Sequence, residues 1–364
     1  MTFFIISDII EEKGVKIVSK NNFYDGTKLL SMPDIDGQKP EIILCTTNRS
    51  AGKTTWFNRY LVKKFIDKKE KFMLMYRFKY EIDDCADKFF KDIKGLYFPE
   101  YDLIAKSRNG IYKDLILNDV HCGYAVSLNS ADNIKKYSHL FSDTTRILFD
   151  EFQSETNNYL PDEISKFISV HTSIARGQGA QSRYVPVYML SNNVNILNPY
   201  FVELGISERL EPNTKFLKGK GYVLEQGFNE NAQDAQKNSR FMVAFSGNKY
   251  AYYSSSSSYL YSDTAFIEKV KGISKYLCTV RYDGTNYAIR EYQSENGSCL
   301  FCDNSVDESF RLKIAVNASD MIPSFQMRLS NDLTINVLRK YFNNGWFKFK
   351  NQQCKAAIIN LLKY

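Results

Sequence analysis

The sequence predicts a mixed α/β chain of two domains, and three observations carry this prediction. Across roughly the first 230 residues, short apolar runs alternate with amphipathic helical stretches, which is typical of a largely parallel sheet with both faces covered. A polar stretch near residue 230 interrupts this alternation. Three short alternating runs with hairpin-turn signals and then a helix follow it, and these indicate a smaller α+β domain.

The domain limits follow the same changes in composition. We place the first domain at residues 1–228, a linker at 229–265 and the second domain at 266–364. The linker contains "NENAQDAQKNSRF", which is polar with helical propensity, and then a serine tract set among tyrosines within 250–263. Such a composition is typical of a small helical segment followed by a flexible connection.

Elements of the first domain are expected in a fixed order. The candidate strands are 41–46, 71–78, 122–128, 146–150 and 185–191. A helix is expected directly after the first of these strands, because Trp56, Tyr60, Leu61 and Phe65 would share one helical face.

The second domain is expected to begin with a three-stranded meander. Its candidate strands are 276–282, 286–292 and 298–303. The pairs Asp283-Gly284 and Asn296-Gly297 are typical of the tight turns that join such strands. A helix is predicted over 330–342 from the helical spacing of its apolar residues.

Composition limits the class of protein. The 364 residues can bury a sizeable core, and the net charge of +7 (48 basic minus 41 acidic residues) permits an anionic partner. No apolar run approaches the ~20 residues of a membrane span, so no membrane partner is expected. The N-terminal "MTFFIISDIIEEKG" lacks a basic start and indicates a short strand or helix rather than a signal peptide.

Cysteine usage fits a reducing cytoplasm, because the seven cysteines are scattered and no export signal accompanies them. Cys299 and Cys302 form an isolated C-x-x-C pair within an alternating run. Without a second pair they do not complete a zinc site, and we interpret them as strand residues.

The stretch "IILCTTNRSAGKTTWF" indicates a phosphate-binding (Walker A) loop between a strand and a helix. In that order, backbone N–H groups and the helix N-terminus hold phosphates, Lys53 reaches the β- and γ-phosphate oxygens, and the Thr54 hydroxyl ligates Mg²⁺. Thr47 stands where such loops usually have their first glycine, and a threonine fits there if its φ stays negative. The predicted nucleotide-binding residues are Arg49, Ser50, Ala51, Gly52, Lys53, Thr54 and Thr55.

A second motif, "TRILFDEFQ", supports a hydrolytic site. It is an apolar strand that ends in Asp150-Glu151. A carboxylate at the end of a buried strand can hold Mg²⁺, and the next acid can polarise the attacking water. We therefore predict that Asp150 contributes to the metal site together with Thr54, and that Glu151 is the catalytic base.

Two further stretches fit such a site. "YMLSNN" is an apolar strand that ends in polar residues, where we expect a sensor of the γ-phosphate; Asn192 is preferred, with Ser191 and Asn193 as alternatives. In "SIARGQGAQSRYVP", Arg176 or Arg183 could act in trans on the ATP of a neighbouring subunit.

These motifs resemble the DNA-packaging ATPases of phi29-like tailed bacteriophages. The resemblance is carried by "TNRSAGKT", "ILFDEFQSETNNYLPDEISKF" and "LSNNVNILNPYF", and continues in "FIEKVKGISKYLCTVRYDG" and "VLRKYFNNGWFKFKNQ". It covers most of the chain and is poorest between residues 205 and 265.

The resemblance implies a specific fold and set of roles. The first domain would be a P-loop ATPase of the additional-strand, catalytic-glutamate type, and the second an RNase H-like relic of a nuclease. Glu151 would be the catalytic glutamate, Asp150 the magnesium-linked aspartate, Arg176 the trans-acting arginine and Asn192 the sensor.

It also implies partners and a place of action. The chain would form a homopentameric ring on the portal of an empty capsid, in the host cytoplasm, and would move double-stranded DNA inward with ATP and Mg²⁺. It would be absent from the mature virion. Whether a structural packaging RNA joins the motor to the portal stays open at the level of sequence.

Four basic residues are candidate DNA contacts. Lys79, with Arg77 two residues before it, lies in a loop that the resemblance places along the central pore. Lys135 or Lys136 would reach toward a neighbouring subunit. The tail from residue 339 onward interleaves cations with aromatic residues, which favours a packed helix and strand with a cationic outer face.

Other functions remain as alternatives. The strand "CTVRY" carries no acid and no convergent cluster of carboxylates is evident, so we predict no nuclease activity. The alternatives to a packaging motor are another P-loop motor, such as a helicase or a secretion ATPase, and a nucleotide-binding adaptor without turnover.

Overall fold

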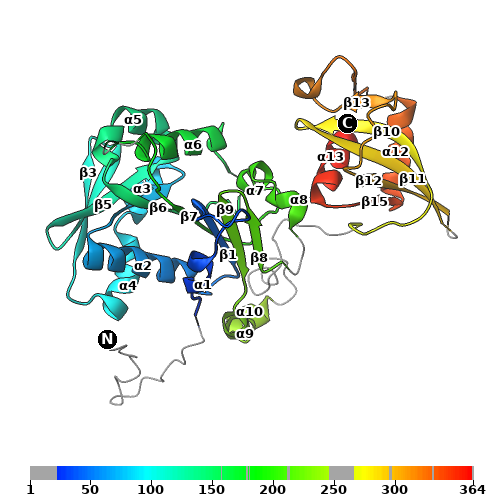
Figure 1. Cartoon of the computed structure of the whole chain (residues 1–364). Helices are drawn as coiled ribbons and strands as arrows, with labels where there is room; N and C mark the ends of the chain where they lie inside the picture. Colours follow the sequence, from blue (N-terminus) through cyan, green and yellow to red (C-terminus); the bar gives the residue numbers. More distant parts are fainter. Residues whose placement is uncertain are drawn as a thin grey trace.

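The computed structural model describes residues 23–156, 158–177, 179, 181–210, 214–245, 266–294, 297–329 and 332–362. These residues form two α/β bodies, with the chain between β9 and β10 connecting them (Figure 1). The N-terminal apolar stretch, the serine tract and Asn296 of the second predicted turn lie outside the described residues.

A nine-stranded sheet forms the first body, in the order β3-β4-β5-β2-β6-β7-β1-β9-β8. Its strands are β1 (Ile42–Thr47), β2 (Lys71–Tyr76), β3 (Leu103–Arg108), β4 (Tyr112–Leu117), β5 (Val120–Ser127), β6 (Thr144–Asp150), β7 (Val187–Asn192), β8 (Phe216–Gly219) and β9 (Tyr222–Gly227). The six central strands from β5 to β9 are parallel, and β3, β4 and β8 extend the edges antiparallel. The five strands predicted from the sequence are all present.

Helices cover both faces of this sheet, as its continuously apolar central strands require. One face carries α1 (Thr27–Ser31), α2 (Lys53–Lys68), α3 (Lys79–Cys85) and α4 (Lys88–Tyr97). The other carries α5 (Ala131–Lys136), α6 (Glu163–Ile174), α7 (Pro199–Glu203) and α8 (Ile206–Arg209), together with the short 3-10 turns η1 (Leu128–Ser130) and η2 (Ser138–Phe141). Each face has its own buried cluster, so the sheet lies between two cores.

The strand order determines where polar strand ends meet. β7 lies between β1 and β6 and is parallel to both. The carboxyl ends of these three strands therefore share one edge of the sheet. This edge carries the predicted phosphate loop after β1, Asp150 at the end of β6 and Asn192 at the end of β7.

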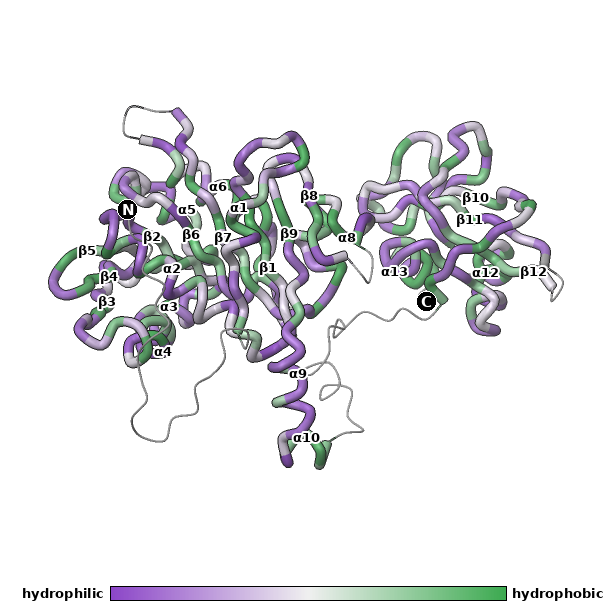
Figure 2. Tube along the Cα trace, turned by 60° about the horizontal axis from the view of Figure 1, so that its bottom comes forward, coloured by the Kyte–Doolittle hydropathy of each residue, from purple (hydrophilic) through white to green (hydrophobic). Residues whose placement is uncertain are grey.

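Two helices follow the last strand of the sheet: α9 (Glu230–Lys237) and α10 (Arg240–Ala244). They project from the body, as Figure 2 shows. Phe241 and Val243 on α10 are 71% and 60% exposed. The helical propensity of the predicted linker is thus realised in its described part.

The second body is a six-stranded sheet in the order β14-β13-β10-β11-β12-β15. Its elements are β10 (Ser274–Tyr282), β11 (Thr285–Ser294), β12 (Gly297–Asp303), β13 (Lys313–Ala315), η3 (Ala318–Asp320), β14 (Gln326–Met327), α12 (Leu333–Asn343), β15 (Phe347–Phe349) and α13 (Gln352–Leu362). The first three strands are an antiparallel meander, as predicted. Asp283 and Gly284 both have positive φ (50° and 74°), as a two-residue turn of this kind requires.

The tail of the chain is mainly structural. Phe347 and Phe349 are buried in the core of the second body, and α13 packs there as well. Arg339 donates to the carbonyl of Leu362 at 3.0 Å and Arg328 to that of Leu361 at 3.0 Å, so two cations hold the carbonyl end of α13. The predicted packed strand and helix are confirmed.

Cys299 and Cys302 both lie on β12, as expected for strand residues. All seven cysteines are free. Within the described part of the chain, no helix is long and apolar enough to cross a membrane.

Candidate active site

The phosphate loop has the strand–loop–helix geometry that the sequence predicts. Gly52, directly before α2, has φ +93°, a conformation that strains any residue with a Cβ. Thr47 is the last residue of β1, is 1% exposed, and has no positive φ. Its neighbour on β9 is Gly227, where an added Cβ would lie 3.0 Å from the Thr47 methyl carbon. The threonine is therefore accommodated by a glycine on the adjacent strand.

Lys53 points at the neighbouring strand end. Its ammonium donates a hydrogen bond of 2.9 Å to the side-chain oxygen of Asn192. Asn192 pairs with Thr47 in the β1–β7 register, so the sheet itself places it beside the loop. Ser191 and Asn193, the alternatives, are 1% and 3% exposed. Asn192 is thus the candidate that contacts the loop lysine.

Asp150 and Thr54 lie together. The Asp150 carboxylate accepts from the backbone N–H of Glu151 at 3.0 Å. Burial raises the pKa of Asp150, while the charge of Lys53 and a hydrogen bond with the Thr54 hydroxyl oppose this shift. A hydroxyl at the start of α2 and a carboxylate at the end of β6 are oxygen donors of the kind that Mg²⁺ prefers, so these residues fit the predicted metal.

Glu151 has an unusual backbone conformation for a glutamate, with φ +55°. The residue is exposed in the single chain, yet its carboxylate lies close to other protein groups. Desolvation, together with the negative charges of Asp150 and Glu155, raises the pKa of Glu151. A raised pKa suits a group that must accept a proton.

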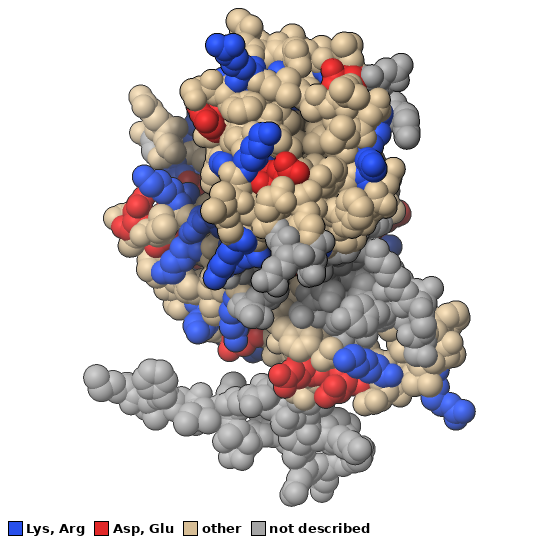
Figure 3. Space-filling model, turned by 90° about the vertical axis from the view of Figure 1, so that its right-hand side faces the viewer, with Lys and Arg blue, Asp and Glu red and all other residues tan. Residues whose placement is uncertain are grey.

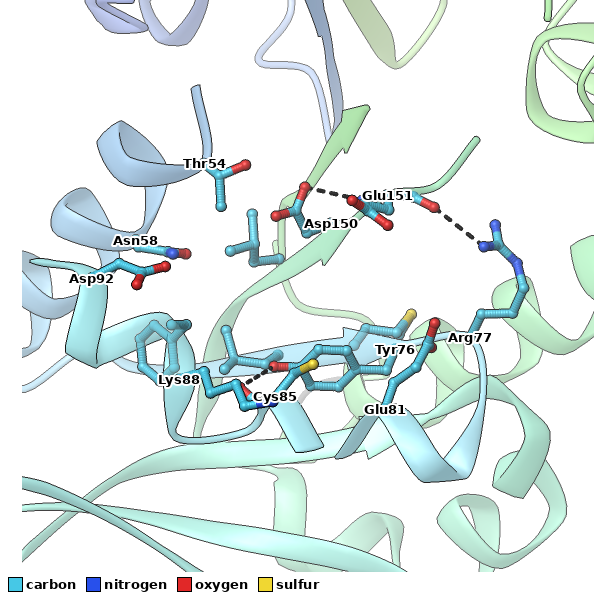
Figure 4. A pocket seen from close by; sticks show the side chains of 14 residues that line it. Thr54, Asn58, Tyr76, Arg77, Glu81, Cys85, Lys88, Asp92, Asp150 and Glu151 are labelled. Carbon is cyan, nitrogen blue, oxygen red and sulfur yellow. Dashed lines mark hydrogen bonds between the residues drawn. The ribbon is translucent and has the colours of Figure 1, made fainter. Parts of the chain in front are cut away.

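Arg77 determines how Glu151 is presented. Its guanidinium donates to the carbonyl oxygens of Glu151 (3.2 Å) and Phe152 (2.6 Å) and forms a buried ion pair with Glu163 at 3.0 Å. Tyr200 donates its hydroxyl to Glu163 at 2.8 Å and completes the arrangement. The Arg77 contact to Glu151 is drawn in Figure 4.

The prediction that Arg77 contacts DNA is therefore corrected. Arg77 is 5% exposed, and the groups it binds lie inside the protein. A cation already paired with a buried carboxylate has no surface to offer to a phosphate. It lies behind Glu151, whose backbone carbonyl it binds.

A cavity of about 290 Å³ opens beside these residues. Its lining includes Thr54, Asp150, Glu151, Arg77 and Lys88. Figure 4 shows Asp150 and Glu151 at the end of their strand, with Thr54 facing them from α2. The acids thus border a space that can hold water and small groups.

Glu155 is a site residue that the sequence reasoning missed. It accepts from Arg49 at 2.6 Å, and the Asn192 side-chain amide approaches the same carboxylate oxygen at 3.5 Å. Glu155 therefore connects Arg49 with Asn192 and, through Asn192, with Lys53. Its position four residues after Glu151, in the polar run "QSETNN", was the available signal.

The rest of the loop contacts the segments around it. Ala51 accepts from the backbone N–H of Tyr24 at 2.8 Å. Ser50, with φ +59°, accepts from the Gln236 side chain of α9 at 2.8 Å. The side chain of Asn48 binds both the backbone carbonyl (3.1 Å) and the backbone N–H (3.0 Å) of Asn229. Thr55 follows Thr54 on α2 and is half-buried.

Arg176 and Arg183 lie far from the phosphate loop of their own chain. Arg183 donates to the carbonyl of Thr144 at 3.3 Å, the first residue of β6, whereas Asp150 is its last. Six residue steps of a strand are roughly 20 Å. Arg183 is held at 2.8 Å by the carbonyl of Ile174 as well, while Arg176 is exposed at the end of α6.

The remaining candidate DNA contacts are exposed. Lys79 is the first residue of α3, at the same sheet edge as the phosphate loop. Its ammonium lies beside Gly110 of the β3–β4 turn, 3.5 Å from where a Cβ of that glycine would be. Lys135 and Lys136 end α5, and Lys135 pairs with Asp132 at 3.3 Å. In the tail, Lys340 and Lys350 are exposed. Figure 3, a view from the right-hand side of Figure 1, shows Lys and Arg side chains projecting from that face of the molecule.

Comparison with known proteins identifies the family. The family model for the podovirus DNA encapsidation protein (Gp16) matches residues 18–364. The chain belongs to this family. The resemblance to phi29-like packaging proteins is thereby confirmed, and so is the predicted function in packaging a bacteriophage genome.

Relatives and solved structures agree with this assignment. The chain is 24% identical to the DNA packaging protein of Bacillus phage phi29 over 350 residues, covering 95% of this chain and 98% of the relative. It is 25% identical to the DNA packaging protein of Bacillus phage B103 over 319 residues, covering 86% and 94%. Its fold is similar to that of a chain in the bacteriophage phi29 genome packaging motor assembly, with a TM-score of 0.67 at 21% identity, covering 94% of this chain and 100% of the other.

Proposed function

We propose that this encapsidation protein is the ATP-hydrolysing subunit of a motor that translocates double-stranded DNA. The observation that carries the proposal is the meeting of Lys53, Asp150, Glu151 and Asn192 at one edge of the sheet. A phosphate-binding lysine, a metal-binding carboxylate, a proton acceptor and a polar sensor are the groups that phosphoryl transfer to water needs.

Each residue has a defined part in this reaction. The loop amides and the start of α2 hold the phosphates, and Lys53 binds the transferred phosphoryl group. Glu151 orients the attacking water and accepts its proton. Arg77 keeps Glu151 in its left-handed backbone conformation, and Asn192 holds the Lys53 ammonium. Thr54 and Asp150 would hold Mg²⁺, which neutralises negative charge on the phosphates when bound.

The additional-strand, catalytic-glutamate class is supported by the strand order. In that class one further strand separates the phosphate-loop strand from the strand that carries the acids. Here β7 lies between β1 and β6, and Glu151 follows directly on the end of β6.

A ring of identical subunits is supported by the place of Arg176. It lies toward the amino ends of the parallel strands, and the phosphate loop lies at their carboxyl ends. An arginine there can complete the site of a neighbouring subunit but not its own, and such a contribution is worth roughly 10³–10⁵ in rate. Lys135 and Lys136 end α5, which packs beside α6, so they belong to the same proposed interface.

The pentameric state and the partners outside the ring follow from the family resemblance alone. They are the capsid portal, duplex DNA and, where one is used, a structural RNA. The motor would act at the portal vertex of the procapsid. Lys79, exposed at the edge where ATP binds, is the proposed contact to the DNA backbone.

The second domain is proposed to be RNase H-like without nuclease activity. Its strand order β12-β11-β10-β13-β14 is an antiparallel meander continued by two parallel strands, and this order supports an RNase H-like fold. The acids near these strands have structural partners: Asp303 pairs with Arg290 at 3.2 Å, and Asp320 accepts from the backbone N–H of Gly284 at 3.0 Å. Metal-dependent DNA cleavage by the pure protein would refute the proposal that this domain has no nuclease activity.

The deciding experiment is steady-state ATP hydrolysis at low salt, alone and with duplex or single-stranded DNA, with Glu151→Gln as the blank. Stimulation by duplex DNA that is lost in the variant supports the motor, and packaging into empty capsids is then the functional assay. A preference for single strands would favour a helicase-type motor. Nucleotide binding with no turnover above the blank would favour an adaptor.

A further inference from the structure

The side chain of Gln153 connects two segments of the active site, and the mechanism proposed above gives it no role. Gln153 is 2% exposed and lies two residues after Glu151. Its side-chain oxygen accepts from the backbone N–H groups of Val194 at 3.1 Å and Asn195 at 2.9 Å. Both donors are in the loop that begins directly after Asn192. One side chain therefore links the segment of the catalytic acid to the segment of the sensor.

The same loop is fixed at its other end. The side chain of Asn198 accepts from the backbone N–H of Phe201 at 3.0 Å and so caps α7. Phe201 is fully buried, and its ring centroid lies 5.8 Å from that of Phe152, the neighbour of Gln153. Gln153 thus holds the start of the loop, and α7 holds its end. A loop held in this way restricts the positions that Asn192 can take.

The oxygen of the Gln153 amide carries this contact. Val194 is 1% exposed, so water does not reach its N–H and a protein acceptor must satisfy it. The amide nitrogen of Gln153 is buried as well, but it has no hydrogen-bond partner within the part of the chain that the structure describes. An unpaired buried donor is unfavourable, so the donor does not explain this residue. A glutamine supplies the acceptor without placing a further negative charge near Glu151.

We propose that Gln153 is a positioning residue for ATP hydrolysis, which keeps Asn192 and Glu151 in one fixed relation around the transferred phosphate. This inference rests on the proposed ATPase function, in which Asn192 holds Lys53 and Glu151 accepts a proton from water. Gln153 is too deeply buried to touch the nucleotide. It acts through Asn192, because the loop that it holds continues directly from that residue.

The first test is Gln153→Leu in the full-length protein, which removes the acceptor but keeps a side chain of similar size. We expect kcat for ATP hydrolysis to fall about tenfold, as is typical when one positioning group is lost. Affinity for ADP, which has no γ-phosphate, should change less than about twofold. In an Asn192→Ala background the same substitution should lower kcat less than about twofold, because the effects of two residues that act as a unit are not additive. Steady-state kinetics and calorimetry measure these quantities.

Gln153→Glu is the conservative variant, because a carboxylate oxygen can still accept from both N–H groups. At a pH where Glu151 is ionised, its kcat should stay within about threefold of the unmodified protein.

The matched control is Asp34→Leu, which removes a buried acceptor of the same kind elsewhere. Asp34 is 5% exposed and accepts from the backbone N–H groups of Asp36 at 2.9 Å and Gln38 at 2.8 Å. It also accepts from Gly221, directly before β9, so it lies at the end of the sheet opposite the phosphate loop. This control should leave kcat of the folded protein within about twofold.

Three results would overturn the inference. An unchanged kcat in Gln153→Leu, or an equal loss in Gln153→Leu and Gln153→Glu, would show that the acceptor does not position the site. An undiminished effect of Gln153→Leu in the Asn192→Ala background would show that Gln153 does not act through the sensor. If the unmodified chain hydrolyses no ATP, it is the proposed function that fails, and this inference fails with it.

A measurement on the unmodified protein covers the case in which thermal unfolding shows that Gln153→Leu is not folded. Amide exchange in residues 193–198 should be slower with a non-hydrolysable ATP analogue than with ADP, because this loop follows the sensor of the γ-phosphate. Exchange in residues 151–153 should slow in parallel, because Gln153 joins the two segments. Equal exchange of the loop with both nucleotides would overturn the proposed role.

Discussion

The ammonium of Lys53 and the side-chain oxygen of Asn192 are 2.9 Å apart, although 139 residues separate them in the chain. Two parallel strands, β1 and β7, bring them together, because each residue follows or ends its strand at the same sheet edge. The lysine that should bind the phosphoryl group is thus already held by the residue expected to sense it. An ammonium has three N–H donors, so Lys53 can bind a phosphate oxygen while it keeps this hydrogen bond.

This geometry predicts the effect of Asn192→Ala. Lys53 would lose a fixed partner and its ammonium would be less well placed for the transition state. We expect kcat for ATP hydrolysis to fall roughly 10- to 100-fold, as is typical when one positioning group is lost, with a smaller change in ATP affinity. Asn195→Ala, on the loop after β7, is the control. A kcat within twofold of the unmodified protein would contradict the role of Asn192.

Glu155 predicts a shift in pH dependence. The pKa of Glu151 is raised by desolvation and by the negative charges of Asp150 and Glu155. Because Glu151 must be ionised to accept a proton, activity should fall as pH drops through this raised pKa. Removing one negative charge with Glu155→Gln lowers that pKa, so the acid limb of kcat should move to lower pH.

The control for this shift is Asp162→Asn. It removes the charge of an exposed carboxylate that does not contribute to the raised pKa of Glu151. It should leave the acid limb where it is. Movement of the acid limb to higher pH in Glu155→Gln would contradict the electrostatic account.

Substitutions of Arg77 and Lys79 are predicted to have opposite effects on stability and DNA binding, although only Phe78 lies between them. Arg77→Ala leaves the carboxylate of Glu163 buried without its main cation, which costs about 3–5 kcal/mol in the free energy of unfolding. It should also lower kcat, since the carbonyl of Glu151 loses its donor. Chemical denaturation and basal ATP hydrolysis measure these two effects.

Lys79→Ala should leave stability nearly unchanged, because Lys79 is exposed. It should weaken duplex-DNA binding and reduce the dependence of log Kd on log salt by about one ion, as expected when one phosphate contact is lost. An unchanged salt dependence would remove Lys79 from the DNA-binding surface.

The sequence predicted those strands and candidate site residues whose signals are local, that is, carried by residues close together in the chain. β1, β2, β5, β6 and β7 were predicted because they are buried on both faces and read as continuous apolar runs. β3 was missed because its sequence, "LIAKSR", lies at the sheet edge and is largely exposed. Lys53 and Glu151 could be chosen as candidates because their motifs are local in the chain: a polar loop followed by a helix, and an apolar strand that ends in acids.

The role of Arg77 could not be predicted from local sequence patterns. In sequence it looks like an ordinary cation at a strand end, similar to Lys79. Its partner Glu163 lies 86 residues further on, on a helix that covers the other face of the sheet. The packing of α6 against β2 and β6 buries Arg77 beside Glu163, whereas Lys79 stays at the surface.

The last prediction concerns coupling between the phosphate loop and the linker. The Asn48 side chain binds both the N–H and the carbonyl of Asn229, at the start of α9. Two such hydrogen bonds contribute about 1–3 kcal/mol, so Asn48→Ala should speed amide exchange in α9 roughly 5- to 150-fold. In the unmodified protein, bound nucleotide should slow this exchange by fixing the loop. In Asn48→Ala this protection should be smaller, because the hydrogen bond between Gln236 and Ser50 is then the remaining contact described above. Hydrogen–deuterium exchange with and without ATP measures both effects.

Ser239→Ala, which removes the hydrogen bond capping α10 but no loop contact, is the control. If nucleotide protects α9 equally in Asn48→Ala, the loop and the linker communicate by another route.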